Sequence, residues 1–232
     1  YKRQGKDMLV RAKTGTGKTA AFCVPIVERI AEGARTTGAI ILAPTRELAQ
    51  QIGEECAAIA RYRDVNVVVL VGGLAMGPQE QALQRGAQIV VGTPGRVLDH
   101  LRRKQLVLAD CGMVCLDEAD EMLSMGFFED VTTILDATPP GRQVLLFSAT
   151  ISEETKRLAD AYLRDPESIR LSTDADNVHS IAHVLYETSP DLHKIRALLY
   201  LLDAVDPTSA VIFCNTREDT ATVASFLDRQ GL

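Results

Sequence analysis

Tryptophan is absent from this sequence of 232 residues, and aromatic residues make up only 5% of it. A surface that stacks several aromatic rings on nucleic-acid bases is therefore not expected. No apolar run is long enough to span a bilayer, and the first residues, YKRQGKD, lack the apolar core of a signal peptide. We therefore expect no membrane contact, a cytoplasmic location, and further residues ahead of Tyr1.

Cysteine is scarce and odd in number, which argues against a disulfide framework. The pairs Cys111/Cys115 and His179/His183 are each spaced by four residues, but neither has a matching second pair, so we expect no zinc site. We interpret the thiols as small buried apolar groups. The five cysteines are Cys23, Cys56, Cys111, Cys115 and Cys214.

An excess of positive charge is also lacking, because the formal net charge is −6. Residues 1–171 carry 21 Lys and Arg against 22 Asp and Glu, whereas residues 172–232 carry 4 against 9. The acidity therefore belongs mainly to the C-terminal stretch, and the first part can still form a local basic patch. With 46% hydrophobic and 24% charged residues, the composition is that of an ordinary globular protein.

Residues 12–19, AKTGTGKT, form a loop that is poor in bulky side chains. Such a loop exposes backbone N–H groups that can surround a phosphate, and Gly15 and Gly17 allow the conformations that this requires. Lys18 can reach the β and γ phosphates, and the Thr19 hydroxyl can bind Mg²⁺. The loop therefore predicts a nucleoside triphosphate site.

The pattern departs from the usual phosphate loop at its first position, where Ala12 replaces glycine. The structural alternative is a turn rich in glycine and threonine that joins a strand to a helix. The candidate residues for binding the nucleoside triphosphate are Ala12, Lys13, Thr14, Gly15, Thr16, Gly17, Lys18 and Thr19.

Short apolar runs alternate with helix-like segments in the first part of the chain. The runs are apolar on consecutive residues, as in parallel strands covered by helices on both faces. This alternation predicts a doubly wound parallel α/β sheet. The predicted strands are 39–42, 65–71, 88–91, 113–116 and 144–147, after the apolar run 8–10. The predicted helices are 19–30, 47–61, 78–85, 96–103, 128–136 and 153–163.

The polar stretch 172–182 has no hydrophobic period and suits a linker. Residues 183–232 then look like the opening of a second α/β unit. Its predicted elements are strands at 183–186 and 210–213 and helices at 192–202 and 220–229. Two strands are too few for a self-sufficient sheet, so we expect a truncated domain.

The stretch LDEAD places Asp117 and Glu118 at the end of the predicted strand 113–116. The carboxyl ends of strands collect ligands in such sheets, so Asp117 should meet the phosphate loop and hold Mg²⁺ together with Thr19. Glu118 is then the candidate that orients the attacking water. The alternative is an acidic first turn of a helix, favoured by the helix dipole. The candidate catalytic residues are Glu118, Lys18 and Asp117.

Further motifs follow the phosphate loop in order: PTRELA (44–49), Gly72-Gly73, TPGR (93–96), DEAD (117–120), SAT (148–150) and VIFCNTR (211–217). This ordered set resembles the DEAD-box family of ATP-dependent RNA helicases, and DEADEMLSMGF is especially close to bacterial members. The resemblance covers most of residues 8–217.

The resemblance implies a RecA-like domain at 1–171, a linker at 172–182 and the start of a second RecA-like domain at 183–232. It also implies that ATP and Mg²⁺ bind between the two domains, while RNA contacts both through its backbone, independently of sequence. Asp120, Ser148 and Thr150 would couple the two sites. The residues implied to bind RNA are Thr45, Arg46, Gly72, Gly73, Thr93, Pro94, Gly95 and Arg96.

Two departures from the family pattern bear on activity. We expect the adenine-reading segment upstream of the phosphate loop and the catalytic arginines of the second domain to be lacking, so this chain alone should be a poor ATPase. The leading hypothesis is an ATP-dependent RNA helicase that unwinds short duplexes. The alternatives are a catalytically weak module that binds nucleotide or RNA, and a related DNA helicase. Taken singly, Pro94-Gly95 could be a turn, Ser148 a helix cap and Arg46 a surface charge.

Overall fold

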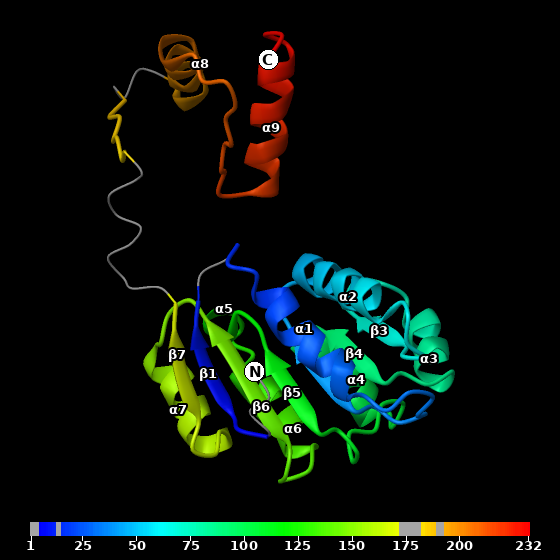
Figure 1. Ribbon diagram of the computed structural model, residues 1–232. Helices are drawn as coiled ribbons and strands as arrows, with labels where there is room; N and C mark the ends of the chain where they lie inside the picture. Colours follow the sequence, from blue (N-terminus) through cyan, green and yellow to red (C-terminus); the bar gives the residue numbers. More distant parts are fainter. Residues whose placement is uncertain (1–4, 13–14, 172–181, 189–192) are drawn as a thin grey trace. The chain divides into compact units, whose positions relative to one another are not determined.

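The computed structural model describes residues 5–12, 15–171, 182–188 and 193–232 (Figure 1). The chain divides into two compact units, Tyr1–Asp176 and Asn177–Leu232, and each is described by itself. The proposed linker lies almost wholly outside the described residues, which include only Ala182 of it. None of the helices in the described ranges is long and apolar enough to cross a membrane.

The first unit is built on a seven-stranded parallel sheet with the order β3-β4-β2-β5-β6-β1-β7. Because every neighbouring pair is parallel, all strands end at the same edge, and the predicted doubly wound α/β class is confirmed. The strands are β1 (Met8–Arg11), β2 (Ala39–Leu42), β3 (Val67–Leu70), β4 (Ile89–Gly92), β5 (Met113–Leu116), β6 (Gln143–Ser148) and β7 (Glu167–Arg170).

Helices cover both faces of the sheet (Figure 1). The helices α1 (Lys18–Arg29) and α2 (Arg46–Ala60) pack on one face. The opposite face is covered by α4 (Pro94–Arg102), α5 (Ala119–Ser124), α6 (Phe128–Asp136) and α7 (Glu153–Tyr162), and α3 (Met76–Gln84) packs Ala82 and Leu83 against the same cluster.

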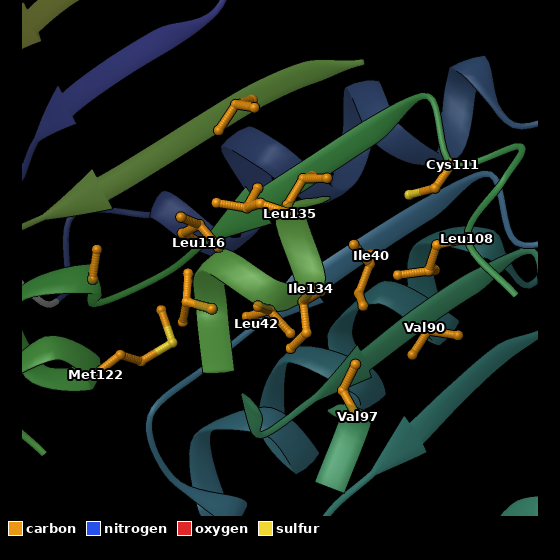
Figure 2. Close-up of a cluster of buried hydrophobic side chains, with 14 of the residues drawn as sticks. Ile40, Leu42, Val90, Val97, Leu108, Cys111, Leu116, Met122, Ile134 and Leu135 are labelled. Carbon is orange, nitrogen blue, oxygen red and sulfur yellow. The ribbon is translucent and has the colours of Figure 1, made fainter. Parts of the chain in front are cut away.

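The central strands are buried on both faces, which explains their continuous apolar sequences. In β2, Ile40 and Leu42 join the cluster drawn in Figure 2, while Ala39 and Ile41 point to the cluster under α1 and α2. All four side chains are fully buried. Burial of an aliphatic side chain contributes about 1.5–3 kcal/mol, so these strands define the core.

The sequence analysis left two elements of the first unit out of its predicted strands and helices, although it named a helix as the alternative for the start of α5. In β7, half-buried and exposed residues alternate, as on an edge strand with one covered face, so there is no apolar run to detect. The helix α5 has only six residues, which is too short to show a clear helical period.

The second unit contains α8 (Lys194–Val205) and α9 (Arg217–Asp228) within its described residues. The predicted strands at 183–186 and 210–213 were wrong, because neither segment forms a strand. Val211 and Phe213 are 80% and 92% exposed. A β ladder needs a neighbouring strand, and the described part of this unit offers none, so an apolar, β-prone sequence alone was not sufficient.

Candidate nucleotide and nucleic-acid site

The predicted site residues of the first unit lie where the strands end. The sheet order divides them into two groups. Lys18, Asp117 and Ser148 follow or end the neighbouring strands β1, β5 and β6, whereas Thr45, Gly72 and Thr93 follow the neighbouring strands β2, β3 and β4. Topology therefore separates the candidate nucleotide residues from the candidate RNA residues along one edge.

The phosphate loop turns through glycines in the left-handed region. Gly15 has φ 80° and Gly17 has φ 77°, conformations that would cost other residues about 1–2 kcal/mol. Gly17 is the N-cap of α1, and no side chain caps the helix. Because the first turn also contains no acid, its N–H groups and the helix dipole form a favourable place for an anion. Lys13 and Thr14 lie outside the described residues.

The structure brings Lys18 and Asp117 together. The Lys18 Nζ lies 3.6 Å from Asp117 Oδ1 and 3.4 Å from the carbonyl oxygen of Ala12, and both charged side chains are buried. Burial raises the pKa of Asp117 above its ordinary value, although the nearby Lys18 charge opposes this change. Ala12 is itself fully buried and donates its N–H to the Ser148 carbonyl at 3.0 Å. The loop and the DEAD segment therefore meet in one place.

Glu118 stands beside this pair as the N-cap of α5. Its backbone is left-handed, with φ 50°, and its N–H donates to Asp117 Oδ1 at 3.0 Å. Burial, and next the negative charge of Asp117, raise the pKa of Glu118. Both features are typical of a functional carboxylate: a sparsely populated backbone conformation and a side chain with increased basicity. The helix alternative for this stretch is also true, since Asp120 and Glu121 lie in the first turn of α5.

Three hydrogen bonds join the SAT segment to the DEAD segment, and a fourth lies within the SAT segment. Asp120 Oδ2 accepts from the Thr150 N–H at 2.8 Å and from the Thr150 hydroxyl at 2.7 Å. The Ser148 hydroxyl accepts from the Asp120 N–H at 3.2 Å and donates to the Thr150 carbonyl at 2.6 Å. Burial alone would raise the pKa of Asp120, but the hydrogen bonds from Thr150 and Ser148 outweigh it and lower the pKa. These hydrogen bonds connect the end of β6 to the first turn of α5.

The other half of the edge carries helix caps. Thr45 caps α2 by accepting from the Leu48 N–H at 3.2 Å, and Pro94 occupies the first turn of α4 after Thr93. Local structure alone would explain these two residue types. No side-chain hydrogen bond caps α4, so its first N–H groups are open to an anion. Gly95 lies in the same first turn.

The loop of residues 71–75, which we call the Gly72 loop, follows the edge strand β3. Gly73 has φ 73°, and a Cβ atom there would overlap the Arg46 guanidinium. The Arg96 Nη1 donates to the Leu74 carbonyl at 3.0 Å. A Cβ atom at Gly72 would meet no atom within 4 Å, so this backbone faces open space. The structure therefore gathers the candidate RNA residues around one exposed loop.

The sequence analysis did not select two buried polar residues that bind backbone groups at the two ends of the strands. Gln79 does so at the carboxyl ends, and Asp7 at the opposite ends. Asp7 is 1% exposed and accepts from the backbone N–H groups of Val144 and Arg164 at 2.8 and 2.6 Å. An acid directly ahead of an apolar run was the available signal. Gln79 is 7% exposed and binds the backbone of Val71 and Ala75. Nothing local marks this glutamine among the others of α3.

Comparison with known proteins decides the family. The family model described as DEAD/DEAH box helicase matches residues 1–158, which is more than half of the chain. The chain belongs to the DEAD/DEAH box helicase family. The chain is 45% identical over 228 residues to the RNA helicase CrhR of Synechocystis sp. and 43% identical over 228 residues to the ATP-dependent RNA helicase DeaD of Escherichia coli K12.

Two solved structures are also similar to this chain. A DEAD box protein from Methanococcus jannaschii matches 98% of this chain with a TM-score of 0.70 and 38% identity. A hypothetical ATP-dependent RNA helicase from Sulfolobus tokodaii matches 72% of the chain with a TM-score of 0.66 and 40% identity. The two alignments with the curated relatives cover 98% of this chain but only 46% of CrhR and 36% of DeaD. The structural alignments cover 60% and 48% of the two solved chains. The chain thus spans less than half the length of these curated relatives.

Proposed function

We propose that this protein is an ATP-dependent RNA helicase, which hydrolyses ATP when RNA is bound and locally separates short duplexes. One observation carries the proposal: the Lys18 amine and the Asp117 carboxylate lie 3.6 Å apart beside the uncapped, glycine-rich start of α1. This arrangement offers donors to a triphosphate and a carboxylate to its metal ion at one point. Family membership supports the same activity.

The triphosphate would lie on the N–H groups of the phosphate loop, with Lys18 on its terminal phosphates. Lys18 now contacts Asp117 and the Ala12 carbonyl, so phosphate would compete with these partners for the amine. Attack of water on the γ phosphorus forms one O–P bond and breaks the bond to the β–γ bridging oxygen. ADP leaves with those electrons, and Glu118 orients the water and accepts its proton. The raised pKa of Glu118 makes it a stronger base for this step.

The oxygen donors at this point fit Mg²⁺. Thr19 lies in the first turn of α1, next to Lys18 in the chain. The amine of Lys18 contacts the buried Asp117 carboxylate. A hydroxyl and a carboxylate are the hard ligands that Mg²⁺ accepts alongside phosphate oxygens and water. Mg²⁺ would neutralise charge on the phosphates. A dedicated protein cage is not needed for this, and the described residues contain no cluster of three or more metal-binding side chains.

Coupling between the two sites would pass through Asp120. Its carboxylate is held by Thr150, and Ser148 links the same turn to the end of β6. A shift of Asp117 and Glu118 towards bound nucleotide therefore moves α5 and the SAT segment together. RNA would bind the other half of the edge through Thr45, Arg46, the Gly72 loop and residues 93–96.

Contacts of backbone N–H groups and arginines with phosphates carry no sequence information, so binding would not depend on RNA sequence. The domain organisation at 1–171, 172–182 and 183–232 belongs to this proposal, as does a cytoplasmic location.

The test is the ATP turnover of the full-length protein with and without single-stranded RNA. We expect RNA to stimulate turnover and single-stranded DNA to stimulate it less. Lys18→Ala should abolish turnover, and Glu118→Gln should lower it by at least about 100-fold. Glu121→Gln is the matched control, because Glu121 is an exposed acid of the same short helix. Turnover that ignores RNA, or a Glu118→Gln variant as active as the control, would refute the proposal.

A further inference from the structure

The helix α3 buries one side chain only, and that side chain is polar. Gln79 is 7% exposed, and every other residue of α3 is partly or fully exposed. A buried primary amide is costly unless its donors and acceptor are satisfied. Its position therefore needs a reason, and the backbone that it contacts supplies one.

The side-chain amide of Gln79 makes the two backbone hydrogen bonds to Val71 that a neighbouring strand would otherwise make. Its Oε1 accepts from the Val71 N–H at 3.1 Å, and its Nε2 donates to the Val71 carbonyl at 3.2 Å. Because β3 is an edge strand of the described sheet, no strand in that sheet completes these bonds on the open side of the chain just beyond it. The same Nε2 also donates to the Ala75 carbonyl at 3.2 Å. One amide thus binds both ends of the Gly72 loop.

Three loop residues lie between these ends, and two of them, Gly72 and Gly73, are among the residues proposed to meet RNA. Gly72 faces open space, Gly73 packs on the Arg46 guanidinium, and Leu74 accepts a hydrogen bond from Arg96. A loop bound at both ends loses less conformational freedom when a ligand binds it, so more of the contact energy is available as affinity. Holding the loop also keeps Arg46 and Arg96 in their present positions.

We propose that Gln79 is a positioning residue for RNA, which holds the Gly72 loop open to the sugar-phosphate chain without touching RNA itself. This inference rests on the proposed function, because it concerns the affinity of the same RNA site. Gln79 belongs neither to the nucleotide half of the edge nor to the helices that form it, so its effect is confined to RNA binding.

The decisive variant is Gln79→Glu, which has nearly the same shape. The carboxylate keeps an acceptor for the Val71 N–H, but it replaces the amide donor with an oxygen that faces the carbonyls of Val71 and Ala75. Gln79→Met removes all three bonds without adding charge. Gln81→Glu is the matched control, because Gln81 is exposed on the same helix and the variant adds the same charge.

The measurement is RNA-stimulated ATP turnover of the full-length protein as a function of RNA concentration. Both Gln79 variants should raise the RNA concentration for half-stimulation by about tenfold, with kcat at saturating RNA and the KM for ATP unchanged. Gln81→Glu should behave as the unaltered protein. A positioning residue should change RNA affinity and leave kcat unchanged. A general loss of structure would instead lower kcat and the melting temperature together.

Three other results would contradict either the positioning role of Gln79 or the proposed function. RNA affinity that is unchanged in both Gln79 variants, while the unaltered protein responds to RNA, overturns the positioning role and leaves the proposed function standing. A parallel loss of kcat and thermal stability reduces Gln79 to a structural residue. An unaltered protein that does not respond to RNA overturns the proposed function and this inference with it.

Discussion

Gly92→Ala should destabilise the first unit through a single methyl group. Gly92 ends β4 and leads directly into Thr93, and a Cβ atom there would lie 2.5 Å from the Leu70 carbonyl oxygen and 2.8 Å from Val97 Cγ2. Carbonyl oxygens in a sheet cannot swing away as a surface side chain can. The new methyl group must therefore separate β4 from β3, or displace α4.

The magnitude follows from three contributions. Overpacking of this kind costs about 1–3 kcal/mol. Separating the strands also weakens the hydrogen bond from the Thr93 N–H to the Leu70 carbonyl, 3.0 Å long, which contributes about 1 kcal/mol. Alanine recovers roughly 0.5–1 kcal/mol relative to glycine in a strand. The net loss is about 1–3 kcal/mol in the free energy of unfolding, or a fall of about 3–10 °C in melting temperature.

Thermal unfolding followed by circular dichroism measures this loss, and Gly141→Ala provides the control. A Cβ atom at Gly141 would meet nothing within 4 Å, and its φ is not left-handed, so alanine there should change stability little or increase it by about 0.4–1 kcal/mol. RNA affinity should also fall in Gly92→Ala, because Thr93 and the Gly72 loop move apart. Equal melting temperatures for the two variants would refute the close approach of β3 and β4 at this point.

Two further predictions concern pH and coupling. His100 is fully buried, and burial lowers its pKa, so the unfolded chain takes up a proton first as the pH falls and stability declines below about pH 6.5. In His100→Gln the free energy of unfolding should change less between about pH 7.5 and 5.5; an identical pH dependence would contradict this. In a double-mutant cycle, Thr150→Val and Asp120→Asn should show a coupling of about 0.5–3 kcal/mol in the free energy of unfolding. Additive effects would show that the hydrogen bonds between Thr150 and Asp120 do not couple the two segments.

The central strands were predictable because a strand that is buried on both faces has apolar residues at consecutive positions of its sequence. In β2, β4 and β5 every residue is buried, so each strand is an uninterrupted apolar run bounded by turn residues. The helix α6 was predicted with the bounds that the structure shows, Phe128–Asp136. The segment 210–213 has the same apolar character and forms no strand in the described structure. The difference lies in the presence of a neighbouring strand, which no local sequence encodes.

The sequence was sufficient to predict that Lys18 and Asp117 lie close together. Both residues follow parallel strands, and parallel strands end at one edge, so their approach follows from the fold class. Their roles in ATP binding stay a prediction, as do those of the RNA residues. The distance of 3.6 Å and the pKa changes at Asp117 and Glu118 were not predictable, because they depend on the packing of side chains around the pair.

The sequence by itself determined the glycine-rich turn at 15–17, the helix caps and the buried central strands, because those features depend on near neighbours along the chain. Only the tertiary structure decided the strand order, which separates the candidate nucleotide residues from the candidate RNA residues along the edge. It also decided that Gln79, alone among the glutamines of α3, satisfies the backbone beyond β3. Both outcomes depend on how helices pack across the sheet between residues distant in sequence, and that packing is a property of the whole unit.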